Sequence, residues 1–152
     1  MILIYLFFIA ALEKAILLAV NDADIGTVCG AVDAFIAEEL LKVFSNKKSK
    51  KMERGIAFPT CLGVNEVMGH FSPVADDSFK LKDGDLVKIE LGAHIDGFAA
   101  QAGHTIVVGG KSSGRQADVI LAAHAALRAA VRTIKVGAIN QTVTENINTA
   151  AE

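Results

Sequence analysis

The stretch that decides the fold is residues 82–110, KDGDLVKIELGAHIDGFAAQAGHTIVVGG. It predicts two β-strands, because polar and apolar side chains alternate over residues 86–92 and residues 105–108 are β-branched and apolar. Between them, Asp96-Gly97 is the dipeptide that most readily supplies the two positive φ angles of a two-residue hairpin turn. We therefore expect the chain to fold back on itself at this dipeptide.

The turn decides which side chains of the two strands share a face. With the dipeptide in the turn, Glu90 pairs with Gly103, and a slide of two residues instead sets Glu90 opposite Gln101. Because side chains alternate with period two, Glu90 and Gln101 share a face in either register. A carboxylate and an amide there are either the remnant of a metal site or part of a solvated face. The residues alone favour the solvated face, since a neutral amide is a poor ligand for a transition metal.

Length and composition predict a single globular domain. The chain has 152 residues, of which 52% are hydrophobic and 21% charged, and this is enough to bury a core. The formal net charge of −2 argues against binding nucleic acid or membrane by bulk charge, although a local basic patch can still act. Cys29 and Cys61 have no metal-ligand spacing and are expected to be reduced core thiols of an intracellular protein.

The first dozen residues, MILIYLFFIAAL, are apolar almost without interruption. They are fewer than the ~20 residues of a membrane span, and no basic residue precedes them as in a secretory signal. We expect a buried or partner-covered helix, with an uncleaved signal-like segment and a start foreign to the native protein as alternatives. The domain organisation is therefore an apolar segment at residues 1–14 and one domain at residues 15–152.

A helix is expected over residues 25–44, with Asp22 or Asp24 as its N-cap. Its inward side is expected to be Val28, Val32, Phe35, Ile36, Leu40 and Val43. A basic linker follows, in which the candidate RNA contacts are Lys47, Lys48, Lys50, Lys51 and Arg54. A short charged connection is more often a solvated loop, so RNA contact is the minority hypothesis here.

Two short strands are expected at residues 55–64 and 67–71, with Pro59 at a sheet edge or a kink. His70 then lies at a strand end, where a rigid turn can aim its ring into a cavity. A lone histidine is more often a structural residue than a catalytic one, so His70 is a candidate only if it lies beside the polar face of the hairpin.

The last part of the chain predicts two helices. The first covers residues 115–135 and ends before Gly137, which is expected in the left-handed conformation. Its inward side is expected to be Val119, Ile120, Ala123, Leu127, Ala130, Val131 and Ile134. A capping box at residues 142–145 is expected to open the second helix, and the sequence stops about two turns later, which indicates a fragment or a truncated gene model.

Two stretches carry a resemblance to a known family: GIAFPTCLGVNEVMGHFSP at residues 55–73 and LKDGDLVKIELGAHIDGFAAQAGHTIVV at residues 81–108. They closely resemble the proliferation-associated proteins, the ErbB-receptor-binding relatives of type 2 methionine aminopeptidases. The resemblance runs from about residue 15 to the end. It implies an α/β (α+β) pita-bread fold, of which this chain matches the first half only: a curved, mainly antiparallel sheet covered by helices.

The resemblance also implies a degenerate metal site. In the active aminopeptidases two Asp ligands lie at the positions of Glu90 and Gln101, a pocket His lies at the position of His70, and the other ligands belong to the second half, beyond Glu152. Here the carboxylate at 90 is one methylene longer and the charge at 101 is lost. A binuclear site needs anionic oxygens to hold two ions, so neither a metal nor another cofactor nor enzymatic activity is expected.

Three functional hypotheses follow. The first is a non-catalytic protein of the cytoplasm and the nucleus or nucleolus that binds RNA or the ribosome and regulatory proteins, and so affects growth and translation. The second is a metal-dependent methionine aminopeptidase completed by a missing second half. The third is an inactive truncated remnant, whose open sheet edge and apolar first helix favour self-association. None of the three includes a membrane span.

Overall fold

The structure, a computed structural model, describes residues 2–43, 52–74 and 77–152. The elements are α1 (Ile2–Leu18), α2 (Ile25–Lys42), β1 (Arg54–Val64), β2 (Leu86–Ile95), β3 (Phe98–Val107), α3 (Gly114–Thr133) and α4 (Asn140–Ala151). The strands form one antiparallel sheet in the order β1-β2-β3. The chain divides into two compact units, of which the first ends at Lys111 and the second begins at Ser112.

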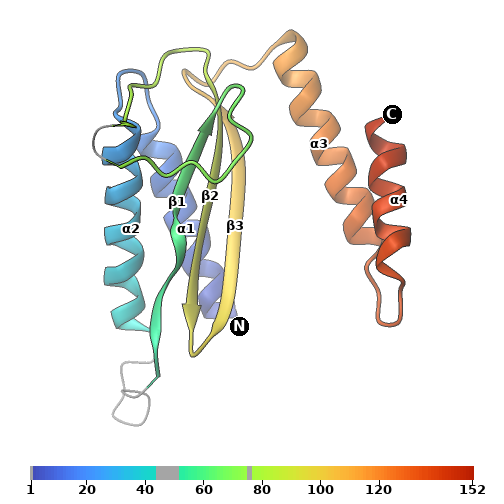
Figure 1. The fold of residues 1–152 in the computed structure, drawn as a ribbon, viewed down its shortest axis with the longest axis horizontal. Coiled ribbons are helices and arrows are strands. Elements are labelled where there is room, and N and C mark those ends of the chain that lie inside the picture. The colour runs from blue at the N-terminus through green and yellow to red at the C-terminus, as the bar shows by residue number, and fades with distance from the viewer. Residues whose placement is uncertain (1, 44–51, 75–76) are drawn as a thin grey trace. The chain divides into compact units, whose positions relative to one another are not determined.

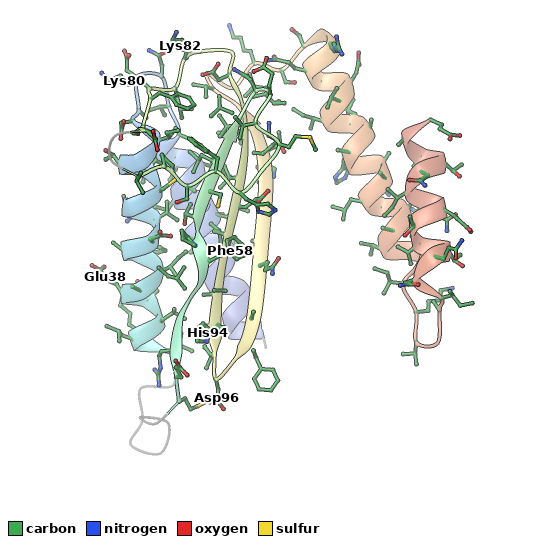
Figure 2. The ribbon with its side chains drawn as sticks, in the orientation of Figure 1. Glu38, Phe58, Lys80, Lys82, His94 and Asp96 are labelled. Atoms are coloured by element: carbon green, nitrogen blue, oxygen red, sulfur yellow. The ribbon has the colours of Figure 1, made fainter. Side chains whose placement is uncertain are left out.

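Strands β2 and β3 form the predicted hairpin. Asp96 and Gly97 occupy the turn with φ angles of 54° and 80°, both positive as a two-residue turn of this kind requires. Asp96 lies at the end of the sheet where β2 turns into β3 (Figure 2). Glu90 pairs with Gly103 and not with Gln101, so the first of the two predicted registers is confirmed.

Two helices cover one face of the sheet. Helix α2 packs along β1 and α1 packs on β2 and β3, with α1 lying behind the strands in Figure 1. The buried side chains that join these layers are Ile25, Val28, Cys29, Val32, Ile36 and Leu40 of α2 and Val87, Ile89, Leu91, Ala93 and Ile95 of β2. We call this the helix face, and the opposite side, which carries Glu90, Gly92, Gln101 and Gly103, the open face.

Helix α2 begins as predicted, with Asp24 as its N-cap. Oδ1 of Asp24 accepts a hydrogen bond from the backbone N–H of Thr27 at 2.8 Å, and Oδ2 accepts one from the Ser78 hydroxyl at 2.6 Å. The bonds from Ser78 and Thr27 hold the pKa of Asp24 below its usual value. The helix ends at Lys42, two residues before the predicted end.

Helix α1 confirms the predicted amino-terminal helix but runs on past residue 12 to Leu18. The Nζ of Lys14 lies 4.6 Å from the centroid of the Phe35 ring, so this charge rests on an aromatic face of α2. No helix among the described residues is long and apolar enough to cross a membrane. The predicted boundary at residue 14 falls inside α1 and stays a prediction.

The two cysteines are buried free thiols, as predicted. Burial raises the pKa of Cys29 to about 12 and also raises the pKa of Cys61. A buried thiol that keeps its proton is a poor nucleophile and a poor metal ligand. Packing in the hydrophobic core is therefore sufficient to explain both cysteines.

The predicted strand at residues 67–71 is wrong. Asn65 and His70 have φ angles of 51° and 58°, which belong to the left-handed region and interrupt an extended chain. The segment is instead a loop that passes in front of the sheet (Figure 1). The N–H of Leu62 donates to the carbonyl of Phe71 at 2.8 Å and so ties this loop to the outer edge of β1.

The second unit consists of α3 packed on α4, joined by a turn in which Gly137 has the predicted positive φ of 82°. The predicted capping box is wrong, because α4 begins at Asn140 and has no side-chain cap. Thr142 already lies in the first turn, where its N–H donates to the carbonyl of Ile139 at 3.1 Å.

The predicted inward stripe of α3 is confirmed at Ala130. Of its members only Ala130 is buried, while Leu127 and Val131 are 59% and 62% exposed. Asn146 of α4 donates to the Thr133 hydroxyl at 2.9 Å, which places α4 on the side of α3 that carries Ala130 and Thr133. The helix α4 therefore lies near one member of the predicted stripe, Ala130.

One side-chain contact ties α2 to β1. Oδ1 of Asp33 accepts hydrogen bonds from both the N–H and the hydroxyl of Thr60, at 2.9 and 2.6 Å. Thr60 is fully buried and lies beside Pro59, where β1 shifts its register and Thr60 has no partner on β2. Asp33 therefore satisfies a backbone group that the bulge leaves out of the ladder.

We expect Asp33→Ala to lower the free energy of unfolding by about 1–3 kcal/mol, because it leaves the buried donors of Thr60 without an acceptor. Urea unfolding followed by circular dichroism measures this change. The control is Glu38→Ala, a carboxylate exposed on the same helix (Figure 2), which should change the value by less than about 0.5 kcal/mol. Equal losses for the two variants would contradict the role of Asp33.

A second contact fixes β1 on β2. Phe58 pairs with Gly92, and a Cβ added at Gly92 would lie 2.5 Å from Cε1 of the Phe58 ring. Such a distance is far inside van der Waals contact, so the ring occupies space that only a glycine leaves free.

Gly92→Ala should therefore lower the free energy of unfolding by about 1–3 kcal/mol through overpacking, and adding Phe58→Leu should restore part of that loss. Thermal and urea unfolding of the two single variants and the double variant give the coupling energy. Gly30→Ala on α2 is the matched control, since nothing lies within 4 Å of its added Cβ, and it should be stabilising. A coupling energy near zero would show that the ring does not fill this space.

Candidate functional site

A histidine from the loop after β1 and a glutamate from β2 meet over the open face. Nδ1 of His70 lies 2.8 Å from Oε2 of Glu90. The left-handed φ of His70 turns the loop back over the sheet and so brings its ring to the strand. The His70 side chain is 90% exposed and that of Glu90 is 31% exposed, so the carboxylate is the sheltered partner of the pair.

The loop touches Glu90 from a second direction. A Cβ added at Gly69 would lie 2.7 Å from Oε1 of Glu90, so the glycine lets the backbone approach this oxygen closely. One carboxylate oxygen therefore faces the backbone at Gly69 and the other faces His70. This arrangement holds the carboxylate in one place.

A hollow of about 600 Å³ lies over these residues. Its lining is Phe58, His70, Glu90, Gln101, Ala102 and Gly103. The structure thus brings together His70, Glu90 and Gln101, as the sequence predicted. Because the Phe58 ring supplies an apolar wall and Glu90 supplies acceptor oxygens, the hollow is suited to a small hydrogen-bond donor or cationic group.

Sequence reasoning missed Phe58 and Gly69 as parts of this site. The register shifts on either side of Phe58 interrupt the alternation of β1, so period two alone does not place its ring. The Phe58-Pro59 step was the available signal, since a proline within a strand marks a bulge that redirects a neighbouring side chain.

The donor set does not fit a binuclear metal centre. In the described part of the chain, no group of three or more His, Cys, Asp or Glu side chains could hold a metal ion. Glu90 is the one carboxylate in the lining of the hollow, and Gln101 contributes a neutral amide. Two divalent ions and the water between them need several anionic oxygens, so the residues described here do not provide a metal site of that kind.

The predicted RNA contacts separate into two groups. Four of them, Lys47, Lys48, Lys50 and Lys51, lie outside the described residues. The guanidinium of Arg54 donates to the backbone carbonyls of Val43 and Leu40 at the end of α2, where a cation also complements the helix dipole. Arg54 is therefore held against the helix end, and its contact with RNA stays a prediction.

The chain is similar to several known proteins. The sequence model named metallopeptidase family M24 matches residues 9–152. "ERBB-3 binding protein 1" of Arabidopsis thaliana is 51% identical over 130 residues, which are 85% of this chain and 33% of that protein. "Proliferation-associated protein A" of Dictyostelium discoideum is 45% identical over 141 residues, which are 90% of this chain and 36% of that protein.

A solved structure of a thermophilic Arx1 aligns with a TM-score of 0.71 and 27% identity over 93% of this chain and 40% of the Arx1 chain. This match confirms the predicted pita-bread fold for the part of the fold that the chain contains. The chain spans about a third of the length of the curated relatives described above. The chain therefore belongs to metallopeptidase family M24, and its predicted resemblance to the proliferation-associated and ErbB-binding proteins of that family is confirmed.

Proposed function

We propose that this chain is a non-catalytic relative of the M24 peptidases that acts by binding RNA or the ribosome and regulatory proteins, and thereby affects growth and translation. The observation that carries the proposal is the donor set of the hollow, which is one carboxylate paired with His70 and one neutral amide. In metal-dependent hydrolysis, bound ions lower the pKa of the attacking water and polarise the scissile carbonyl. Side chains that do not hold the ions leave a hollow that can bind but not hydrolyse.

The proteins to which the chain is similar support the choice of partners. One is named for binding ERBB-3 and another for its association with proliferation. A protein partner that contacts the open face fits these names. The proposed location of the protein is the cytoplasm and the nucleus or nucleolus. The RNA side of the proposal rests on the basic linker, whose closely spaced lysines can contact successive phosphates.

The proposal predicts that the chain releases no amino-terminal Met from a test peptide in the presence of Co²⁺ or Mn²⁺. Chromatographic detection of free Met measures the release, with an active methionine aminopeptidase assayed alongside as the positive control. Glu90→Ala is the diagnostic variant. Metal-dependent turnover that this substitution abolishes would overturn the non-catalytic proposal and favour the aminopeptidase hypothesis.

Replacing Lys47, Lys48, Lys50 and Lys51 with Ala should weaken binding to a single-stranded RNA and flatten its dependence on salt. If each lysine contacts one phosphate, the slope of log K against log salt should fall by up to about 3. Fluorescence anisotropy over a series of salt concentrations measures this slope.

The matched control removes four exposed lysines elsewhere, by changing Lys80, Lys82, Lys111 and Lys135 to Ala. Because the net charge changes equally in both variants, bulk charge alone would give equal effects. Equal slopes for the two variants would place the RNA contact outside the linker.

A further inference from the structure

Helix α3 carries a row of basic side chains. His124, Arg128 and Arg132 follow one another at four-residue steps, so they lie along one side of the helix at a rise of about 6 Å per step. All three are exposed. They line a hollow of about 470 Å³, which we call the basic groove, and its lining is Leu121, His124, Ala125, Arg128, Ala129 and Arg132.

The basic groove owes its shape to the sizes of its residues. Ala125 and Ala129 lie one turn apart and form its floor, because their short side chains leave space that longer ones would fill. The basic residues form one wall, and Leu121 adds an apolar contact at the amino-terminal end. A cationic wall beside an apolar floor suits a ligand that has both anionic groups and flat, weakly polar ones.

The two arginines face away from α4. Ala130 is buried and Thr133 accepts a hydrogen bond from Asn146, so these two residues mark the side of α3 along which α4 lies (Figure 1). Arg128 and Arg132 are each two residues from Ala130. Because an α-helix turns by about 100° per residue, both lie on the opposite side of α3.

The arginines are also separate from the apolar side of α3. Leu127, Val131 and Ile134 lie between the side of α4 and the side of the arginines, and they are 59%, 62% and 65% exposed. Arginine is almost never fully buried without a partner. A segment that packs on α3 therefore gains most over the apolar side and leaves the basic groove at the surface.

The charge of the row is not balanced by neighbouring acids. No ion pair between described residues involves Arg128 or Arg132. Asp118, the one acidic residue of α3, lies about 15 Å from Arg128 along the axis, which exceeds the screening length of ~8 Å at physiological salt. Like charges at a four-residue spacing destabilise a helix. An anionic ligand in the basic groove would remove this repulsion.

We propose that the basic groove binds single-stranded RNA, with Arg128 and Arg132 on neighbouring phosphates and a base or ribose over Leu121 and the alanine floor. The guanidinium fork matches the oxygens of a phosphate, and the His124 ring can stack on a base. An acidic peptide would also satisfy the arginines, but it offers no base to the rest of the groove. The inference rests on the RNA binding in the proposed function and adds a contact separate from the basic linker.

Fluorescence anisotropy of a labelled single-stranded RNA with the full 152-residue chain tests the groove. Changing Arg128 and Arg132 to Ala removes two phosphate contacts. The slope of log K against log salt should therefore fall by about 1.4, and the dissociation constant should rise up to about 25-fold at about 0.1 M salt.

The matched control changes Lys111 and Arg115 to Ala, which removes the same charge from exposed residues outside the groove. It should leave the slope and the dissociation constant nearly unchanged. Equal effects of the two double variants would show that bulk charge alone acts, and they would overturn the proposal.

Two further measurements separate binding from folding. Alanine is the best helix former and the substitutions remove a repulsion, so the double alanine variant should keep or slightly raise the free energy of unfolding in urea. Arg128→Lys combined with Arg132→Lys keeps both charges but loses the forked hydrogen bonds. It should keep the salt slope and weaken binding by a smaller factor than the alanines do.

The outcomes distinguish this inference from the proposed function. If the double alanine variant binds RNA as the wild type does, while the four-lysine linker variant binds more weakly, the basic groove is overturned and the proposed function stands. A wild-type chain that binds no RNA would overturn both. An oligo-glutamate peptide with as many charges as the RNA should bind at least about tenfold more weakly. Equal binding of that peptide, lost with the same two arginines, would overturn the assignment to RNA in favour of an acidic protein.

Discussion

The rest of the first unit depends on one constraint, the two positive φ angles at Asp96 and Gly97. They fix the register of β2 on β3, and because side chains alternate with period two, the register fixes both faces of the sheet. The apolar side chains of β2 then meet α1 and α2, and Glu90 and Gln101 are left on the open face. A shift of one residue in this register would turn the core side chains of the strand to the open face and the side chains of the site to the helix face.

The bulge at Pro59 complements that constraint on the other side of β2. It disrupts the ladder, turns the Phe58 ring over Gly92, and leaves the N–H of Thr60 to bond with Asp33. The loop after β1 then returns over the open face and places His70 on Glu90. The same bulge and loop satisfy backbone N–H groups along the outer edge of β1, at Thr60 and Leu62.

The sequence predicted correctly those elements that depend on residues close to one another in the chain. The Asp96-Gly97 turn, the Asp24 cap and the apolar stripe of α2 follow from side chains acting on their own backbone or at a fixed period, and the structure has all three. The wrong predictions concern segments whose structure depends on contacts with residues distant in the sequence. The left-handed residues Asn65 and His70 make a loop where a strand was predicted at residues 67–71, and of the predicted inward stripe of α3 only Ala130 is buried. The site was predicted in part, because the hairpin face is local whereas the approach of Phe58 depends on the bulge.

The central claim is that the side chains around Glu90 do not hold a pair of divalent metal ions. Equilibrium dialysis of the purified chain against micromolar Co²⁺, followed by measurement of the metal content, tests this claim most directly. Wild-type chain and Glu90→Ala should retain the same background amount of cobalt, well below one ion per chain. Near-stoichiometric cobalt in the wild-type chain that Glu90→Ala removes would contradict the account, because Glu90 would then be a working metal ligand.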